Sequence, residues 1–227
     1  MIPQPTVKVR MKEIADNFRL FSPCIFAGRF LFFRHSEGME FFIMKKNQTV
    51  IRTAVMAMLT AVSIVLVYFI HLPLIPGFAF LEYDPADIPV LIGAMMLGPV
   101  SGIIILLAVC LIQALTVSAA SGWIGFVMHF VASSVLILIP SLIYRKKKTT
   151  VSLIIGLVIG VLAMTAVMIP LNLVFTGIFM GTGVKAVASL LIPAIIPFNL
   201  AKAAINAVVT FAVFTPIAKV LKKYTVI

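Results

Sequence analysis

Long apolar runs fill most of this 227-residue sequence and constrain its fold more than any other feature. Six of them lie at residues 50–70, 86–98, 100–118, 123–144, 151–176 and 189–218. A helix needs about 20 mostly apolar residues to cross the hydrocarbon core of a bilayer. Hydrophobic residues make up 62% of the chain and charged residues 11%, whereas a soluble domain is typically about 25% charged. The sequence therefore predicts an all-α integral membrane protein with six transmembrane helices.

The second run is the shortest, and Gly98 and Pro99 separate it from the third. Glycine and proline interrupt helices. We therefore expect two helices joined by a tight turn.

The basic residues indicate how the chain is oriented. The net charge is +11, and the basic clusters lie at residues 45–52, 145–148 and 219–223, between or beside apolar runs. With six spans all three clusters fall on one side, which the positive-inside rule assigns to the cytoplasm. The opposite side then holds the loops 71–84, 118–122 and 177–188. This placement predicts a multi-pass protein of the plasma membrane with both termini in the cytoplasm, and it argues against nucleic acid as the partner of the positive charge.

Residues 1–43 differ from the rest of the chain, because their short apolar stretch is interrupted by Arg29. The stretch fits neither a spanning helix nor a signal peptide. Met44 begins a segment typical of the start of a membrane protein. We interpret 1–43 as a poorly ordered extension or the result of a mis-assigned start, and 44–227 as the membrane domain.

Several polar residues lie inside the apolar runs, where they are costly. Lys202 has no acid within its own run, and Asn199 lies three residues earlier on the same helical face. Asn172 follows Pro170 in the fifth run, and Gln113 adds an amide in the third. Such residues usually face a bundle interior or a cavity. They either hydrogen-bond one another or form a ligand site, and their amides and ammonium suit a planar, carbonyl-rich heterocycle.

The segment 71–84 and the two acids at or just after its end, Asp84 and Asp87, also have structural interpretations. The segment is strongly apolar for a loop, so it is either an interfacial aromatic belt or a lid over an outward-facing cavity. Asp84 fits the N-cap of the next helix, Pro85 the first helical position and Asp87 a capping-box acid. We therefore expect structural roles for both acids.

Enzymatic chemistry finds no support in the sequence. No phosphate-binding G-x-x-x-x-G-K-[ST] loop and no metal-ligand spacing of His, Cys or carboxylates is present. Cys24 and Cys110 form no disulfide or metal pattern, and no inverted repeat typical of secondary transporters is visible. We expect neither a catalytic residue, a metal nor a cofactor.

Four segments resemble a known family. Residues 83–92 (YDPADIPVLI) with 97–102 (LGPVSG) resemble the signature of the substrate-binding S components of energy-coupling factor (ECF) vitamin transporters. Residues 163–172 (AMTAVMIPLN) and 196–202 (IPFNLAK) resemble its riboflavin-specific members. The similarity extends from about Met44 to the C-terminus.

The resemblance implies an S-component-like bundle of six helices that captures riboflavin from outside the bacterial cell. It further implies docking on an ECF module, which comprises a transmembrane coupling protein and two ATPases. The family's small-residue docking motif falls on Ala57 and Ala61, which are spaced for close helix approach. The residues expected to contact riboflavin are Asn172, Asn199, Lys202, Phe80, Leu81, Tyr83 and Gln113.

Two other interpretations stay open. The chain is an S component for another vitamin, such as folate, thiamine or a pyridoxine-like ring, or it is a structural membrane subunit without a ligand. The sequence gives neither the affinity nor whether the coupling module is dedicated or shared.

Overall fold

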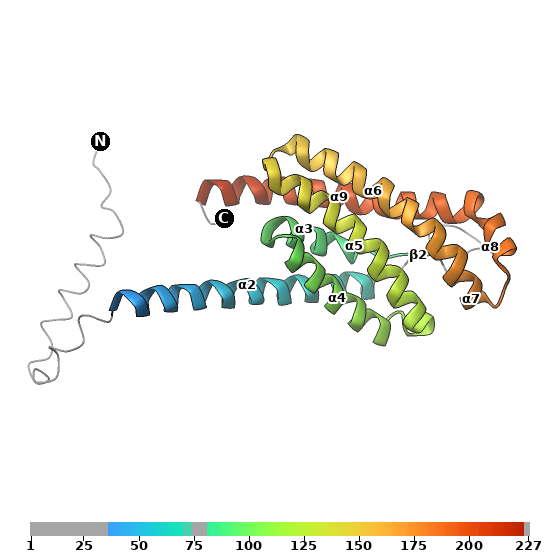
Figure 1. Ribbon diagram of the computed structural model, residues 1–227, viewed down its shortest axis with the longest axis horizontal. Helices are drawn as coiled ribbons and strands as arrows, with labels where there is room; N and C mark the ends of the chain where they lie inside the picture. Colours follow the sequence, from blue (N-terminus) through green and yellow to red (C-terminus); the bar gives the residue numbers. More distant parts are fainter. Residues whose placement is uncertain (1–35, 71, 74–80, 225–227) are drawn as a thin grey trace, which may run out of the picture. The chain divides into compact units, whose positions relative to one another are not determined.

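The computed structural model describes residues 36–70, 72–73 and 81–224 (Figure 1). The chain divides into two compact units, Met1–Val50 and Ile51–Ile227. Residues 1–35 lie outside the described part, and 36–43 belong to the first long helix. The interpretation of 1–43 as an extension stays a prediction. The ligand cavity lies in the second unit.

Helices make up nearly all of the described chain. The principal helices are α2 (Ser36–Phe69), α3 (Asp87–Leu97), α4 (Pro99–Leu115), α5 (Gly122–Lys147), α6 (Thr150–Leu171) and α9 (Ile196–Tyr224). Shorter pieces connect them: the 3₁₀ turn η2 (Ala119–Ser121), the π-helical turns η3 (Asn172–Thr176) and η4 (Leu191–Ile195), and the helices α7 (Gly177–Met180) and α8 (Val184–Leu190). The prediction of a six-helix membrane bundle is confirmed.

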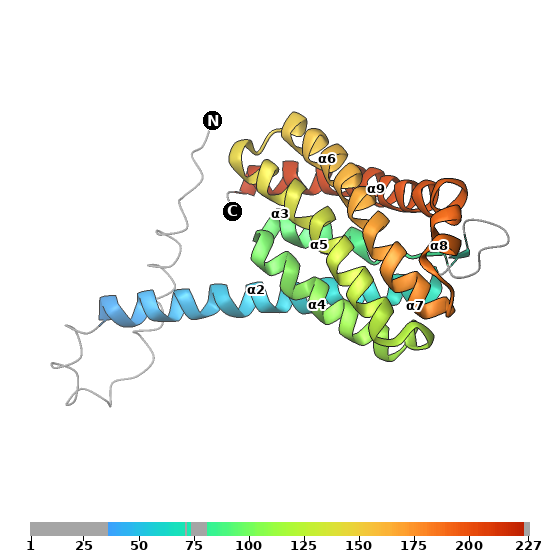
Figure 2. The same cartoon turned by 45° about the vertical axis from the view of Figure 1, so that its right-hand side comes forward.

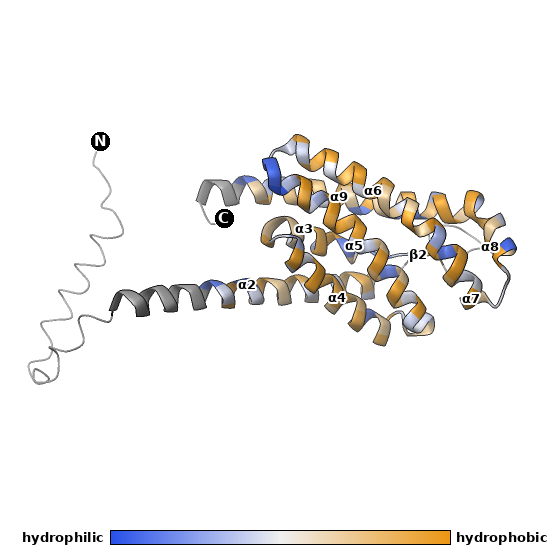
Figure 3. Ribbon diagram, in the orientation of Figure 1, coloured by the Kyte–Doolittle hydropathy of each residue, from blue (hydrophilic) through white to orange (hydrophobic). Residues whose placement is uncertain are grey.

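Four stretches of the described chain are long and apolar enough to cross a membrane. They are Gln48–Phe69, Ala119–Lys147, Thr150–Met180 and Val184–Lys219. Helices α3 and α4 are shorter, with 11 and 17 residues. Figure 3 shows the apolar residues that dominate these helices and the hydrophilic turn between α5 and α6.

Helix α3 lies at the centre of the second unit, in contact with α4, α5 and α9 (Figures 1 and 2). Every residue from Asp87 to Met95 is buried. Gly98 adopts φ +102° in the turn to α4, a conformation that glycine allows at no steric cost. Gly102 then lets α4 approach closely, because a β-carbon there would collide with Ala94. The short helix is thus buried over most of its length.

The segment predicted as the loop 71–84 contains regular structure in its described residues. Strand β1 (Leu72–Pro73) pairs antiparallel with β2 (Glu82–Tyr83), and Leu72 lies opposite Tyr83. This ladder was not predicted from the sequence, since two-residue strands carry no periodicity. The expected lid falls on residues 74–80, which lie outside the described part.

The prediction of a loop at 177–188 is wrong for most of its length. Helix α7 continues from η3 to Met180, and α8 begins at Val184. Ile178, Phe179 and Met180 extend the apolar pattern, and the chain reverses only at Gly181, where φ is +63°. The true connection is therefore about three residues long, at 181–183.

Candidate ligand-binding site

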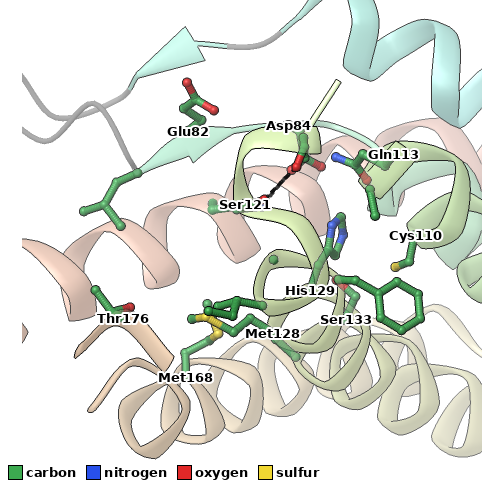
Figure 4. A pocket seen from close by; sticks show the side chains of 18 of the residues that line it. Glu82, Asp84, Cys110, Gln113, Ser121, Met128, His129, Ser133, Met168 and Thr176 are labelled. Carbon is green, nitrogen blue, oxygen red and sulfur yellow. Dashed lines mark hydrogen bonds and ion pairs between the residues drawn. The ribbon is translucent and has the colours of Figure 1, made fainter. Parts of the chain in front are cut away.

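A cavity of about 710 Å³ lies among α4, α5, α6, η3 and α9. This volume is within the usual range of small-molecule sites, about 300–1,000 Å³. Figure 4 shows that Asp84, Gln113 and His129 come together on one side, while Met168 and Thr176 lie on another. The polar lining residues are Glu82, Asp84, Gln113, Ser118, Ser121, His129, Ser133, Asn172, Thr176, Asn199 and Lys202. The remaining wall is largely apolar, with Phe126, Met164, Met168 and Phe198 among its members.

Lys202 does not stand alone in the cavity wall. Its ammonium Nζ lies 2.8 Å from Oδ2 of Asp84, and both side chains are largely buried. The apolar run of Lys202 holds no acid, and the acidic partner comes instead from a position 118 residues away in the sequence. Burial raises the pKa of the Asp84 carboxyl, but the charges of Lys202 and His129 and the hydrogen bonds from Lys202 and the Ala86 backbone together hold that pKa below its usual range.

The expected capping roles of the two acids are also wrong. Helix α3 begins at Asp87, with Ala86 as its N-cap and no side-chain cap bond. Asp84 Oδ1 instead accepts a hydrogen bond from the backbone N–H of Ala86 at 3.3 Å, as in an Asx turn. The acids are drawn inward because basic side chains of other helices are available to them.

A second set of polar contacts lies beside the first. His129 Nε2 is 3.3 Å from Oδ1 of Asp87, and the Asn206 amide donates to Oδ2 of Asp87 at 3.5 Å and to the Asp84 carbonyl at 3.4 Å. The Tyr83 hydroxyl donates to Oδ1 of Asn206 at 2.9 Å. Together these contacts connect β2, α3, α5 and α9.

Each of the two asparagines of the predicted site lies in or near a π-helical turn. Asn172 begins η3, and its amide donates to the Met168 carbonyl at 2.8 Å. Asn199 lies shortly after η4, and its amide donates to the Ile195 carbonyl at 2.8 Å. Prolines weaken the backbone ladder here, and the sequence suggested free carbonyls for a ligand. At Ile195 the carbonyl is taken by the side chain of Asn199 itself.

Within the described part of the chain, three buried polar atoms that line the cavity have no hydrogen-bond partner. They are Gln113 Oε1, Ser133 Oγ and Asn199 Oδ1. An unsatisfied buried polar atom costs about 1–3 kcal/mol. A ligand that offers N–H or O–H groups at these positions recovers that energy, so the cavity suits a partly polar ring bound between apolar walls.

The structure brings most, but not all, of the predicted site residues together. Leu81, Gln113, Asn172, Asn199 and Lys202 line the cavity. Tyr83 is buried but faces Asn206 instead of the cavity. Phe80 lies outside the described residues. Ala57 and Ala61 are exposed on α2, away from the cavity.

Asp84, His129 and Asn206 were not singled out as site residues by sequence reasoning. Asn206 lies four positions after Lys202 and seven after Asn199, so helical spacing alone places it on their face. No helical spacing of this kind marks Asp84 as a site residue, because its partner lies on a distant element.

Among the described residues, no group of three or more His, Cys, Asp or Glu residues is arranged to hold a metal ion. The polar groups of the described cavity wall are amides, hydroxyls, the His129 imidazole, the Glu82 carboxylate and the Asp84–Lys202 ion pair.

Comparison with known proteins decides the family. Residues 52–214 match the model of the ECF transporter, substrate-specific component. The chain belongs to this family. The match includes every described residue of the cavity wall.

Individual relatives agree with this S-component assignment. The chain is 32% identical over 180 residues to the riboflavin transporter RibU of Streptococcus thermophilus, covering 76% of this chain and 85% of that protein. It is 28% identical over 182 residues to RibU of Staphylococcus aureus, covering 76% and 93% respectively. A solved structure of the S component of a bacterial ECF transporter superposes with a TM-score of 0.67 and 32% identity, over 77% of this chain and 99% of that one. The S component is thus a transporter subunit and not an enzyme.

Proposed function

We propose that this S component captures riboflavin for uptake. The observation that carries the proposal is the similarity to RibU of Streptococcus thermophilus over 85% of its length. The cavity supports it, because orphaned acceptors at Gln113 and Asn199 lie in the same wall as a charged donor at Lys202. The isoalloxazine ring is planar and carries both carbonyl oxygens and N–H groups, which match these atoms.

Within this proposal the binding roles are as follows. Lys202 donates to a ring carbonyl, while Asn199 and Gln113 accept from ring or ribityl donors. Asn172 and Leu81 complete the wall, with Phe80 and Tyr83 belonging to the segment that closes it. Riboflavin is the transported ligand, and no cofactor takes part.

The energy for transport comes from partners. We propose that the S component docks through Ala57 and Ala61 on an ECF module of one transmembrane coupling protein and two ATPases. Both small residues are exposed on α2, which supports a close helix approach there. The basic clusters support a topology with both termini in the cytoplasm of a bacterial cell.

Fluorescence of riboflavin tests the proposal directly. Full-length protein purified in detergent is titrated into riboflavin, and binding is expected to quench the fluorescence in a saturable manner. A competition series with folate, thiamine and pyridoxine tests the other vitamins, and none of them is expected to restore the signal. Absence of quenching, or displacement by one of the competitors at lower concentration than riboflavin, would overturn the proposal.

A further inference from the structure

The ion pair between Asp84 and Lys202 connects two distant parts of the chain that both contribute to the cavity wall. Asp84 follows strand β2, at the end of the outer hairpin, and Lys202 lies in α9. Both side chains line the cavity, with exposed fractions of 7% and 12%. The 2.8 Å distance between Nζ and Oδ2 is that of a charge-assisted hydrogen bond.

The Asp84 carboxylate is itself fixed in place. Its Oδ1 accepts from the backbone N–H of Ala86, which leaves Oδ2 for Lys202. The carbonyl of Asp84 accepts from Asn206, one helical turn beyond Lys202 on α9. Two bonds independent of Lys202 therefore hold Asp84, one at its carboxylate and one at its backbone carbonyl, and the carboxylate in turn fixes the position of the ammonium.

Lys202 depends on this contact. A lysine among apolar helices either finds a counter-charge or becomes neutral, because an isolated buried ammonium is very costly. An ammonium has three N–H donors, and Asp84 accepts one of them in the structure. The remaining donors stay available in the cavity wall.

The other charged and titratable groups near this pair have different partners. Asp87 pairs with His129 and also accepts from Asn206. Tyr83 donates its hydroxyl to Asn206. Among the described residues, Asp84 is the acid within ion-pair distance of Lys202, so Asp87 cannot replace it without a rearrangement of α3.

We infer that Asp84 is a positioning residue for ligand binding: it keeps Lys202 charged and directed to the polar edge of the ligand. This role rests on the proposed function, because Lys202 is the group that contacts riboflavin. Asp84 acts through Lys202, and its removal weakens binding without removing any contact of its own to the ring.

The Asp84→Asn variant tests the role. The amide keeps the shape and the acceptor for Ala86 but removes the charge. We expect riboflavin affinity to fall roughly 10- to 100-fold, by analogy with the loss of metal affinity when the hydrogen-bond partner of a metal ligand is removed. Ser63→Ala is the matched control, since the Ser63 hydroxyl donates to the carbonyl of Ala86 at 3.0 Å in the same segment but outside the cavity. Its affinity is expected to remain that of the natural protein.

A double-mutant cycle separates positioning from a purely structural effect. In a Lys202→Met background, Asp84→Asn is expected to cause no further loss of affinity, because the group that it positions is gone. An equal loss in both backgrounds would show that Asp84 acts independently of Lys202 and would overturn the inference. Unchanged or tighter binding by Asp84→Asn would overturn it as well.

Two measurements keep these outcomes distinct from other failures. Thermal unfolding of each variant without ligand reports folding, and Asp84→Glu, which retains the charge, is expected to recover at least part of the affinity if Asp84→Asn loses it. If the natural protein fails to quench riboflavin, the proposed function fails. If it quenches and Asp84→Asn binds equally well, only the positioning role fails.

Discussion

Helices α2 and α9 are both long and apolar, but they relate to the rest of the bundle in different ways. In Gln48–Phe69, 11% of the most apolar stretch is buried inside the protein, whereas in Val184–Lys219 the buried share is 28%. In α2 the fully buried positions Ser63 and Val67 are four residues apart, and the opposite face is exposed. In α9 the buried face carries Asn199, Asn206 and Thr210, with Lys202 beside them.

Under the proposed function, the difference corresponds to two separate tasks. Helix α9 uses its polar residues within the protein, at the cavity and the ion pair. Helix α2 presents small and apolar residues outward, where lipid or a partner helix covers them, and few polar contacts hold it. Arg52, near the middle of α2, donates to the Leu97 carbonyl and the Ser101 hydroxyl, and Ser63 donates to the Ala86 carbonyl. Substitutions on the two helices should therefore affect transport and binding separately.

The largest effect is expected on the exposed face of α2. Replacing both Ala57 and Ala61 by Trp prevents close approach of a partner helix. Riboflavin uptake by cells that depend on this protein is expected to fall to background, while quenching by the purified variant stays unchanged. Val158→Trp is the control, because Val158 is exposed on α6 at 54%. Normal uptake by the Ala57/Ala61 variant would show that α2 is not the docking helix.

The next effect is expected at the cavity face of α9. Lys202→Met keeps the length of the side chain and removes its charge, at a cost of about 3 kcal/mol in binding, the upper range for a charged hydrogen bond. This corresponds to a roughly 100-fold weaker riboflavin affinity. Fluorescence titration measures it, and an affinity within a factor of two of the natural protein would remove Lys202 from the site.

Asn206 should influence stability more than binding. Asn206→Leu leaves the Tyr83 hydroxyl, the Asp84 carbonyl and one Asp87 oxygen without their partner. We expect a loss of about 2 kcal/mol in the free energy of unfolding, the typical cost of orphaned buried groups. Denaturant unfolding in detergent measures the loss, and a stability equal to that of the natural protein would show that these contacts are dispensable.

The smallest effect is expected for the Ser63 contact of α2. Ser63→Ala removes one hydrogen bond, and such bonds between membrane helices average about 0.6 kcal/mol. The loss in the free energy of unfolding should be measurably smaller for this variant than for Asn206→Leu. A loss as large as that of Asn206→Leu would mean that α2 is held as tightly as α9, and the contrast between the two helices would not hold.

The parts of the fold that depend on hydropathy were predictable from the sequence. The apolar runs located the helices, the Gly98–Pro99 turn separated α3 from α4, and burial of Lys202 and Asn199 followed from their setting. These features are local, so composition and spacing determine them. The length of α7 and α8 was missed because Gly177, Gly181 and Gly183 gave that segment the appearance of a loop.

The contacts between site residues that are far apart in the sequence could not be predicted from composition and spacing. Asp84 looked like a helix cap because the residues next to it in sequence form a good capping pattern. Its true partner comes from α9, and only the packing of α3 against α9 brings the two together. The same holds for Tyr83, for which the family resemblance implied ligand contact but whose hydroxyl donates to Asn206.

The two π-helical turns have a consequence for how such a protein accommodates a change in chain length. Each α-helical residue rotates its successor by about 100°, and a π-turn accommodates one additional residue. Loss of a single residue from Leu191–Ile195 would therefore restore a regular helix and leave Asn199 and Lys202 on nearly the same face, because the π-turn is what accommodates the additional residue. A one-codon deletion confined to this π-turn would thus change the length of the chain without exchanging the ligand-facing side chains that follow it.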